Sequence, residues 1–328
     1  MIITRTPFRI SFVGGGSDLR EFYHKHQGAV LSTSINKYMY ISSHKFFEEG
    51  KIRAKYSQTE TVENIEDLKH DIIREALKMV NIRGGVEVSS IADIPAGTGM
   101  GSSSSFTVGL LHNLYAIKRE YASKETLAHE ACRMEIDVLK EPIGKQDQYA
   151  AAFGGLNIFR FNSNETVTVE PLYLKQEVYK QLEENLVLFY IGNARKASDI
   201  LIEQKENMAK ADKFTVLKQM VALVNELRDV LYKGNLDEFG KLLHQNWLLK
   251  QSLASKISND SISDLYNLGL KNGATGGKLL GAGGGGFFLF YCPKEKQEKL
   301  IKAIPARHFD FNFDNEGTKL IYFGDEWA

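Results

Sequence analysis

The sequence predicts an α+β fold in two domains, and three observations support this prediction. Apolar residues make up 43% and charged residues 25% of the 328 residues, which is typical of a globular protein with a substantial core. In the first third, strand-like segments follow one another in runs, which favours α+β over a doubly wound sheet. The second half begins with consecutive helical segments and ends in further strands. We place the domain boundary near residues 175–185, with domains at residues 1–180 and 181–328.

The first hundred residues contain most of the predicted strands. β-Branched and aromatic residues dominate residues 2–13, which we interpret as strand, a kink at Pro7, and strand. Apolar residues recur at helical spacing over residues 67–80, which predicts an amphipathic helix. The other segments predicted here are a short helix at residues 19–26 and strands at residues 29–47, 51–57 and 85–91.

The rest of the chain alternates between helical and strand-like regions. A helix is predicted directly after Ser105 and another over residues 123–140, where Pro142 ends it. The segment around Asp147 is predicted as a short helix closed by Gly154 and Gly155. Later helices are predicted at 197–210, 214–232, 236–253, 261–272 and 294–304, and strands at 156–161, 166–174, 184–192, 287–291, 308–313 and 319–324.

The composition excludes several classes of function. Lys and Arg together number 41, as do Asp and Glu, so the net charge is zero, which argues against a general nucleic-acid or anionic-membrane binder. No run of about 18 apolar residues and no signal peptide is visible, so we expect a cytoplasmic protein without nucleic-acid or membrane partners. Cys132 and Cys292 are too few for a disulfide framework or a metal site.

One stretch, residues 93–111, has the composition of an anion-binding loop. Pro95 begins a turn, and Gly97, Gly99 and Gly101 allow positive φ and close approach of a ligand to the backbone. Serines 102 to 105 then lead into the helix, and serine is a favourable N-cap residue. A helix start presents unpaired N–H groups and partial positive charge. The stretch therefore predicts a cradle for phosphate.

Other phosphate-binding motifs fail on the details of the sequence. A P-loop requires Ser or Thr after its Gly-Lys pair, but Lys278 is followed by Leu279, and Asn272 stands where the first glycine belongs. The protein-kinase signatures HRD and DFG are absent. Residues 281–286 match a dinucleotide-binding pattern but precede a strand-like segment instead of a helix.

Three glycine-bearing motifs remain, and their order and spacing resemble the GHMP kinases. They are PFRISFVGGGSD, PAGTGMGSSSS and KLLGAGGGG, and the resemblance covers nearly the whole chain. It implies an N-terminal domain with a left-handed βαβ crossover, a C-terminal ferredoxin-like domain and an active site between them. It also implies an enzyme that uses ATP and Mg²⁺ on a small-molecule acceptor. Oligomeric state stays open, with a homodimer as one option.

The resemblance assigns the middle motif to the nucleotide phosphates and to Mg²⁺. Among the serines, Ser103 matches the Mg²⁺ ligand best, with Ser102 or Ser104 as alternatives, and Glu135 matches the second ligand, with Glu130 as the fallback. Oxygen ligands of this kind suit Mg²⁺, which keeps water and phosphate oxygens around it. The residues implied to bind nucleotide are Pro95, Gly97, Thr98, Gly99, Met100, Gly101, Ser102, Ser103 and Ser104.

The resemblance also implies the catalytic residues. Asp147 matches the aspartate that takes the proton from the acceptor hydroxyl, since an alcohol is a poor nucleophile until its proton is accepted. Arg9 and Lys145 are the residues expected to compensate the charge of Asp147, and an ion pair with Arg9 would keep that carboxylate ionised.

For the acceptor, Asp18 matches an aspartate that contacts sugar hydroxyls. The residues before it, Gly14, Gly15, Gly16 and Ser17, depart from the Gly-Glu-His-Thr of galactokinases, which argues against galactose and suits a bulkier or anionic substrate. We expect Arg195 and Lys196 to meet a phosphate on the substrate, with Lys37, Arg83 and Arg160 as alternatives. Two glycines of the last motif, Gly283 and Gly284, are expected to line the acceptor side.

Two segments narrow the acceptor further. TPFRISFVGGGSDL and residues 190–198 resemble the branch of sugar 1-kinases that acts on D-glycero-D-manno-heptose 7-phosphate. This implies phosphorylation of the O1 hydroxyl, giving a 1,7-bisphosphate for nucleotide-activated heptose synthesis. The alternatives are a fucokinase-like or other sugar 1-kinase and, in another class, a catalytically silent ligand sensor with the same fold.

Overall fold

The strands form two sheets in the computed structural model, which describes residues 1–192, 197–255 and 257–324. Within these ranges the first sheet has nine strands, with β13-β1-β2-β5-β3-β4 as its main order and β6, β7 and β12 joined through β2. Its pairs are antiparallel except β3 with β5. The strands are β1 Ile2–Val13, β2 Gly28–Lys45, β3 Ile52–Lys55, β4 Thr59–Val62, β5 Val86–Ala92, β6 Leu156–Phe161, β7 Val167–Pro171, β12 Phe313–Asp314 and β13 Lys319–Phe323.

The second sheet is antiparallel, in the order β11-β8-β10-β9. Its central strands are fully or nearly fully buried, as expected for their continuous apolar sequences. The strands are β8 Leu186–Tyr190, β9 Gly276–Leu279, β10 Phe287–Tyr291 and β11 Arg307–Phe309.

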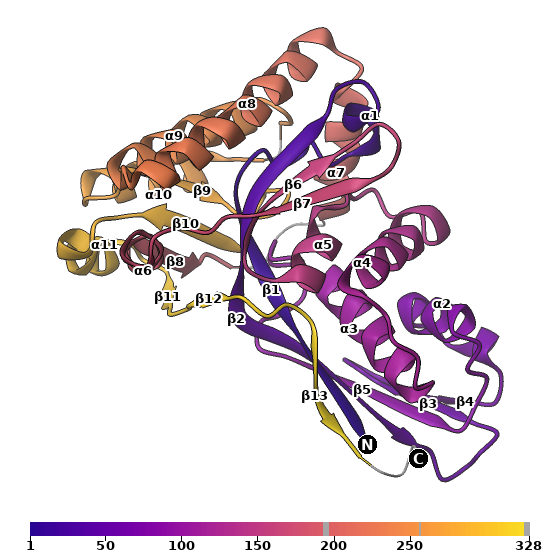
Figure 1. The fold of residues 1–328 in the computed structure, drawn as a ribbon. Helices are drawn as coiled ribbons and strands as arrows, with labels where there is room; N and C mark the ends of the chain where they lie inside the picture. The colour runs from indigo at the N-terminus through magenta and orange to yellow at the C-terminus, as the bar shows by residue number, and fades with distance from the viewer. Residues whose placement is uncertain (193–196, 256, 325–328) are drawn as a thin grey trace.

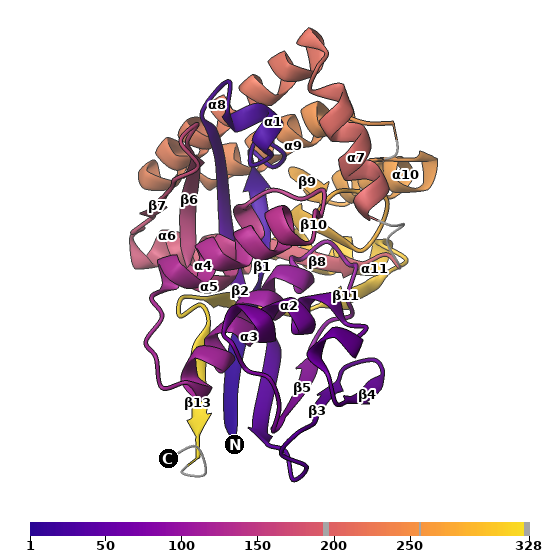
Figure 2. The ribbon, with the colours of Figure 1, turned by 90° about the vertical axis from the view of Figure 1, so that its right-hand side faces the viewer.

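The helices cover both sheets and meet along β1. Helices α2, α3, α4 and α5 lie on one side of the long strands β1 and β2, and the second sheet lies on the other (Figure 1). Helices α7, α8 and α9 gather at one end of the molecule, opposite β3, β4 and β13 (Figure 2). The helices are α1 Arg20–Tyr23, α2 Asp71–Met79, α3 Ser102–Ile117, α4 Lys124–Cys132, α5 Gln146–Phe153, α6 Gln176–Glu184, α7 Ala197–Asn207, α8 Ala211–Lys233, α9 Leu236–Gln251, α10 Asp260–Lys271 and α11 Gln297–Ala303. A π-helical segment, Arg133–Val138, continues α4, and short 3₁₀ helices lie at Ile65–Asp67 and Lys294–Lys296.

β1 is the strand that joins the two parts of the molecule. Its apolar residues Phe8, Ile10 and Phe12 are fully buried, and the strand contacts α3 and α5 as well as α8 and α9. The prediction that Pro7 divides this segment into two strands is wrong, because the strand is continuous. The proline instead coincides with a shift of register against β2 between Pro7 and Phe8. Residues that follow Phe8 on this strand are thereby directed between the two groups of helices.

Three elements were not anticipated from the sequence. β9 lies in a glycine-rich stretch for which no strand was predicted. The other two are β4 and α6. β4 is a short strand with alternating exposed and half-buried residues, and α6 buries only Leu182, so both lack the apolar pattern by which such elements are found. The chain end also differs from the expected two-part division, because β12 and β13 pair with β2 and β1 of the first sheet. The division at residue 180 stays a prediction, and residues 313–323 return to the sheet of the first part. In the described residues, no helix combines the length and apolarity needed to cross a membrane.

Candidate active site

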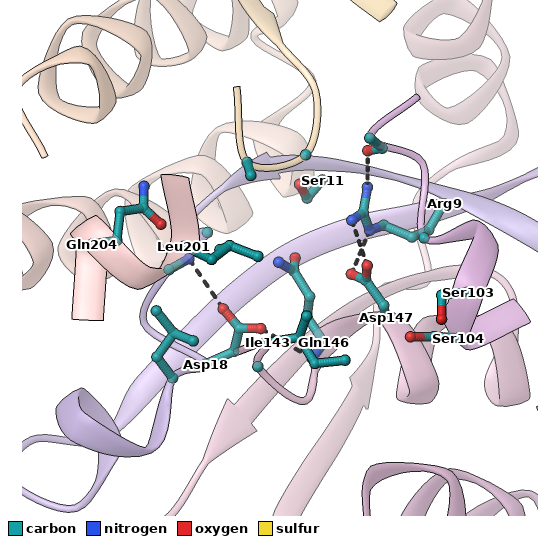
Figure 3. A pocket seen from close by; sticks show the side chains of 18 of the residues that line it. Arg9, Ser11, Asp18, Ser103, Ser104, Ile143, Gln146, Asp147, Leu201 and Gln204 are labelled. Atoms are coloured by element: carbon teal, nitrogen blue, oxygen red, sulfur yellow. Dashed lines mark hydrogen bonds and ion pairs between the residues drawn. The ribbon is translucent and has the colours of Figure 1, made fainter. Parts of the chain in front are cut away.

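A cavity lies where β1, the turn before α3, the loop before α5 and helices α7 to α9 meet (Figure 3). Residues of all three glycine-bearing motifs line it, although they are far apart in the sequence. Arg9 and Ser11 project from β1, Asp147 lies in the first turn of α5, and Ser103 lies in the first turn of α3. The structure therefore brings residues of the three motifs together around one cavity.

Arg9 and Asp147 form the ion pair expected from the sequence. The guanidinium donates from Nε and Nη2 to the two carboxylate oxygens of Asp147, both at 2.7 Å (Figure 3). Its Nη1 donates to the carbonyl oxygen of Gly99 at 2.6 Å, and its side chain and backbone together are only 4% exposed. A two-pronged, charge-assisted contact of this kind fixes both distance and orientation. Arg9 thus holds the carboxylate of Asp147 at a set position beside the glycine loop.

The glycine loop enters α3 through left-handed backbone. Gly97, Gly99 and Gly101 have φ of 75°, 81° and 75°, and Gly101 is the N-cap residue in place of the expected serine. A Cβ on Gly101 would lie 3.2 Å from a carboxylate oxygen of Asp147, and one on Gly99 would lie 2.7 Å from the carbonyl oxygen of Leu280. The first N–H groups of α3 have no partner within the helix and lie at the cavity. This arrangement suits an anion.

Glu135 lies behind the serines of this loop and is fully buried. Its carboxylate accepts hydrogen bonds from Ser103 Oγ at 2.7 Å, Ser104 Oγ at 2.8 Å and Gln148 Nε2 at 2.6 Å. Burial raises the pKa of this carboxyl. Glu130, the fallback ligand, instead accepts from the hydroxyl of Tyr115.

The oxygen atoms around Glu135 fit Mg²⁺ but do not complete its coordination. Mg²⁺ is commonly held by one or two protein oxygens together with phosphate oxygens and water. In the described part of the chain, no three His, Cys, Asp or Glu side chains gather into a site that could hold a metal ion. A bound Mg²⁺ would therefore depend on the phosphates for its other ligands, with Glu135 and either Ser103 or Ser104 on the protein side.

Asp18 lies across the cavity from the glycine loop. It is 3% exposed and accepts hydrogen bonds from the N–H groups of Gly16 at 3.1 Å and Gln146 at 3.2 Å (Figure 3). Burial, with a further contribution from the charge of Asp147, raises the pKa of Asp18 to about 6. Gln146 lies between Asp18 and Asp147, and its buried Oε1 has no hydrogen-bond partner among the described residues. Gln146 stood in a polar patch of the sequence but received no role there.

Lys145 does not compensate the charge of Asp147 as expected. Its ammonium donates to the backbone oxygen of Glu165 at 2.9 Å, pairs with the carboxylate of the same residue, and lies 4.8 Å from the ring centroid of Tyr23. Its charge is therefore used in an ion pair that ties the start of α5 to the turn between β6 and β7.

Several residues predicted to bind substrate or nucleotide lie outside the cavity wall. The hydroxyl of Ser17 donates to the carbonyls of Gly14 and Ala29, so it secures the backbone of the first motif, and Gly14 itself packs against Ala29. Gly283 and Gly284 pack against Ile257 instead of the cavity. The predicted residues outside the wall are Gly14, Ser17, Pro95, Thr98, Met100, Gly283 and Gly284, and Arg195 and Lys196 lie outside the described residues.

Other predicted binding residues do line the wall. From the first motif Gly15, Gly16 and Asp18 face the cavity, and from the last motif Gly281 and Ala282 take the place expected for Gly283 and Gly284. The middle motif contributes Gly97, Gly99, Gly101, Ser102, Ser103 and Ser104.

Two buried lysines in the wall were missed by the sequence reasoning. Lys250 of α9 and Lys278 of β9 are 6% and 1% exposed, and both line the cavity. The available signal was weak: Lys250 follows Asn246 and Trp247 on the buried face of α9, where an apolar residue is the rule. Lys278 begins the third glycine-bearing motif and was tested as part of a P-loop, but it received no role of its own.

The sequence was compared with models of protein families and with known proteins. The model of the GHMP kinases N terminal domain matches residues 68–155, and that of the GHMP kinases C terminal domain matches residues 227–310. D-glycero-alpha-D-manno-heptose 7-phosphate kinase from Campylobacter jejuni is 29% identical over 338 residues, covering 97% of this chain and 98% of that protein. The bifunctional fucokinase/GDP-fucose pyrophosphorylase of Arabidopsis thaliana is 24% identical over 93% of this chain, which spans 31% of that protein.

A solved structure shows the same fold over the full length. The crystal structure of a D-glycero-D-manno-heptose 1-phosphate kinase from Bacteroides thetaiotaomicron superposes with a TM-score of 0.81 at 22% identity, covering 99% of this chain and 100% of that one. The fold is thus shared with that protein.

Proposed function

Since the chain belongs to the GHMP kinases and is an ATP-dependent sugar kinase of that family, we propose that its acceptor is D-glycero-D-manno-heptose 7-phosphate. In this proposal the γ-phosphoryl group of ATP is transferred to the anomeric O1 hydroxyl, and the product is the 1,7-bisphosphate, an intermediate suited to nucleotide-activated heptose synthesis. ATP and the sugar phosphate are the partners, and we place the enzyme in the cytoplasm.

The observation that carries the phosphotransfer step is the placement of Asp147 beside the N-terminus of α3. Arg9 holds Asp147 in one orientation, and the cavity reaches from the glycine loop on one side to Asp18 on the other. A hydroxyl bound between Asp18 and Asp147 would face the phosphate that lies on the glycine loop. Asp147 orients this hydroxyl and accepts its proton as the new oxygen–phosphorus bond forms.

The nucleotide side is formed by the middle motif. Gly97, Gly99, Gly101 and the first turn of α3 present backbone N–H groups to the triphosphate. Glu135 and Ser103 or Ser104 would hold Mg²⁺, which supplies charge neutralisation on the phosphates when bound.

The acceptor side supports a large acceptor with several hydroxyl groups. Asp18 offers a carboxylate to a sugar hydroxyl, and Gln146 has a free carbonyl oxygen that can accept another. Gly15 leaves space for a large acceptor, since a Cβ there would meet no atom within 4 Å. Arg195 and Lys196 stay our proposal for contact with the 7-phosphate. The similarity to the Campylobacter jejuni heptose 7-phosphate kinase over nearly the full length of both chains favours this acceptor.

The experiment is a coupled ADP-release assay with a panel of acceptors. We expect the highest kcat/KM with D-glycero-D-manno-heptose 7-phosphate and much lower values with fucose, galactose and mevalonate. Turnover with fucose and none with the heptose phosphate would replace our acceptor with the fucokinase-like alternative. Saturable binding of a sugar phosphate without ADP release from any acceptor would support the silent sensor instead.

A further inference from the structure

We propose that Lys250 and Lys278 form, beside Arg9, a cationic subsite that binds the phosphoryl group while it is being transferred. This inference rests on the proposed function, because it presumes phosphoryl transfer in the cavity. It does not depend on which sugar is the acceptor.

Lys250 reaches the cavity from α9 and is anchored to the third glycine motif. Its Nζ donates to the carbonyl oxygens of Leu279 at 3.0 Å and Gly281 at 2.5 Å. Gly281 packs directly on Gly99, since a Cβ on Gly281 would lie 2.4 Å from the Cα of Gly99. The carbonyl of Gly99 is in turn the acceptor for Arg9. Lys250 therefore lies at the junction of the two glycine loops, on the same side as the Arg9–Asp147 pair.

Lys278 approaches the same junction from β9. Its Nζ donates to the carbonyl oxygens of Ser11 at 2.6 Å and Phe12 at 3.1 Å. Ser11 lines the cavity and lies two residues after Arg9 on β1. The side chains of Arg9 and Ser11 therefore lie on the same face of this strand. The ammonium of Lys278 thus lies along β1 between the catalytic pair and the first glycine motif.

No acidic side chain among the described residues forms an ion pair with either of these lysines. Every hydrogen bond from the two ammonium groups within the described residues goes to a backbone carbonyl, whereas Arg9 has Asp147 as its counterion. A buried cation without a counterion is unfavourable in a folded protein. Burial, with the nearby charge of Arg9, lowers the pKa of Lys250 to about 7 and that of Lys278 well below its usual range. A bound anion would raise both pKa values again and hold the two side chains as ammonium groups, so the pair has a use when an anion occupies the cavity.

Each ammonium also keeps one donor unused. A lysine side chain has three N–H donors, and two of them are taken by carbonyls in both residues. Because both side chains line the cavity, the third donor of each is available to a ligand oxygen. Two such donors, fixed by backbone anchors, form a preorganised site that needs no rearrangement when the ligand's charge develops.

The transferring phosphoryl group is the anion that this position suits best. During transfer, the bond from the γ-phosphorus to the β–γ bridging oxygen breaks and ADP leaves with its electron pair. The acceptor oxygen bonds to the phosphorus, and its proton goes to Asp147. The negative charge is spread over the three equatorial oxygens, between the glycine loop and Asp147. Lys250 and Lys278 lie at this boundary and would stabilise those oxygens.

The test compares Lys250→Met and Lys278→Met with the wild-type enzyme. Both changes retain an unbranched stem of similar length and remove the charge. We expect kcat to fall by about 10² or more in each variant, the range found when one preorganised donor to a transition-state oxygen is removed. The affinity for ADP and the KM for the acceptor should change by less than about threefold, because the interaction is made mainly in the transition state.

A second readout separates a catalytic role from a structural one. ADP with Mg²⁺ and aluminium fluoride, a mimic of the transferring phosphoryl group, should bind the variants more weakly by a factor similar to the loss in kcat. Unchanged affinity for this complex would overturn the proposal. So would a loss restricted to phosphorylated acceptors with normal kcat on an unphosphorylated sugar, which would assign the lysines to the substrate phosphate.

The chain provides a matched control. Lys124 also donates from Nζ to two backbone carbonyls, Phe153 O at 2.9 Å and Glu316 O at 2.6 Å, but it does not line the cavity. Lys124→Met should leave kcat and aluminium fluoride binding unchanged; an equal loss there would mean that losing carbonyl anchors alone explains the effect, against our proposal. If Lys250→Met does not fold, Lys250→Gln and Lys278→Met provide the same comparison.

The experiment distinguishes a failure of the proposed subsite from a failure of the proposed acceptor. The complex needs only ADP, Mg²⁺ and aluminium fluoride, so it reports on the subsite whichever sugar is used. Wild-type protein that binds the complex but phosphorylates no heptose phosphate would reject the acceptor and leave the subsite standing. Wild-type and variants that bind it equally would reject the subsite and leave the acceptor standing.

Discussion

Arg9 holds the carboxylate of Asp147 with two hydrogen bonds of 2.7 Å and uses its remaining terminal nitrogen to contact the carbonyl of Gly99 at 2.6 Å. Arg9 comes from the N-terminal strand, Asp147 from the start of α5, and Gly99 from the loop before α3. One buried guanidinium therefore sets the position of the proposed base relative to the proposed phosphate loop. Phosphoryl transfer depends on such positioning more than on covalent chemistry.

Asp147→Asn should lower kcat by about 10² or more while leaving the affinity for ADP nearly unchanged, since a general base contributes to the rate in that range. Steady-state kinetics and calorimetric titration with ADP measure the two quantities. Asp137→Asn is the control, because Asp137 pairs with Arg20 on the surface. Near-normal turnover of Asp147→Asn would remove the base role and leave electrostatic stabilisation as the main source of catalysis.

Gly101→Ala should reduce both stability and activity. The residue has φ of 75°, and its Cβ would lie 3.2 Å from a carboxylate oxygen of Asp147. We expect a loss of unfolding free energy on the order of 1–3 kcal/mol and a displaced catalytic carboxylate. Gly50→Ala is the matched control, because a Cβ there meets no atom within 4 Å. Urea unfolding and kcat are measured for both, and equal effects at the two positions would contradict the role given to Gly101.

Glu135→Gln should raise the Mg²⁺ concentration needed for half-maximal activity by about tenfold or more, because a neutral amide is a much weaker ligand than a carboxylate for a hard cation. Without Mg²⁺ the variant should be at least as stable as the wild type, since burial already disfavours the charged form of Glu135. The control is Glu130→Gln, which removes a carboxylate charge but keeps an amide oxygen as acceptor for Tyr115, and it should leave the Mg²⁺ dependence unchanged. A shift in Glu130→Gln alone would restore the fallback ligand.

Asp18 should make stability depend on pH between about 4 and 6. Its pKa is raised from 3.8 to about 6 by burial, so the folded protein holds this proton more tightly than the unfolded chain. Its contribution to stability is then full below pH 3.8 and is lost as the pH rises through 6. Relative to Asp18→Asn, the wild type should lose up to about 3 kcal/mol of unfolding free energy across this window. Denaturant unfolding at pH 4, 5, 6 and 7 measures this difference, and a pH-independent difference would contradict it.

The sequence predicted the local chemistry of this site better than it predicted how the side chains of the site pack. Glycine and serine patterns predicted the phosphate cradle, because a cradle of this kind depends on residue type and spacing. The pairing of Arg9 with Asp147 was instead implied by the resemblance to the GHMP kinases. Lys145 was misassigned because nothing local shows that Glu165, in a turn between two later strands, supplies its partner. Lys250 and Lys278 were missed for the same reason, since their burial arises only when α9 and β9 pack against β1.

Prediction of the fold from the sequence has a similar limit. Apolar periodicity predicted most helices and strands of the core, but β4 and α6 are too polar to be found by it. The pairing of β13 with β1 joins residues that are more than three hundred positions apart, such as Ile2 and Phe323, and no local pattern encodes that contact.

Our main proposal is that the enzyme phosphorylates an anomeric hydroxyl. Identification of the product is the decisive test of this proposal. D-glycero-D-manno-heptose 7-phosphate is incubated with ATP, Mg²⁺ and the enzyme, and the product is examined by phosphorus NMR. Our account predicts a second sugar phosphate signal coupled to the anomeric proton, formed in equal amount with ADP. ADP formation with the new phosphate on another carbon, or no sugar bisphosphate at all, would contradict it.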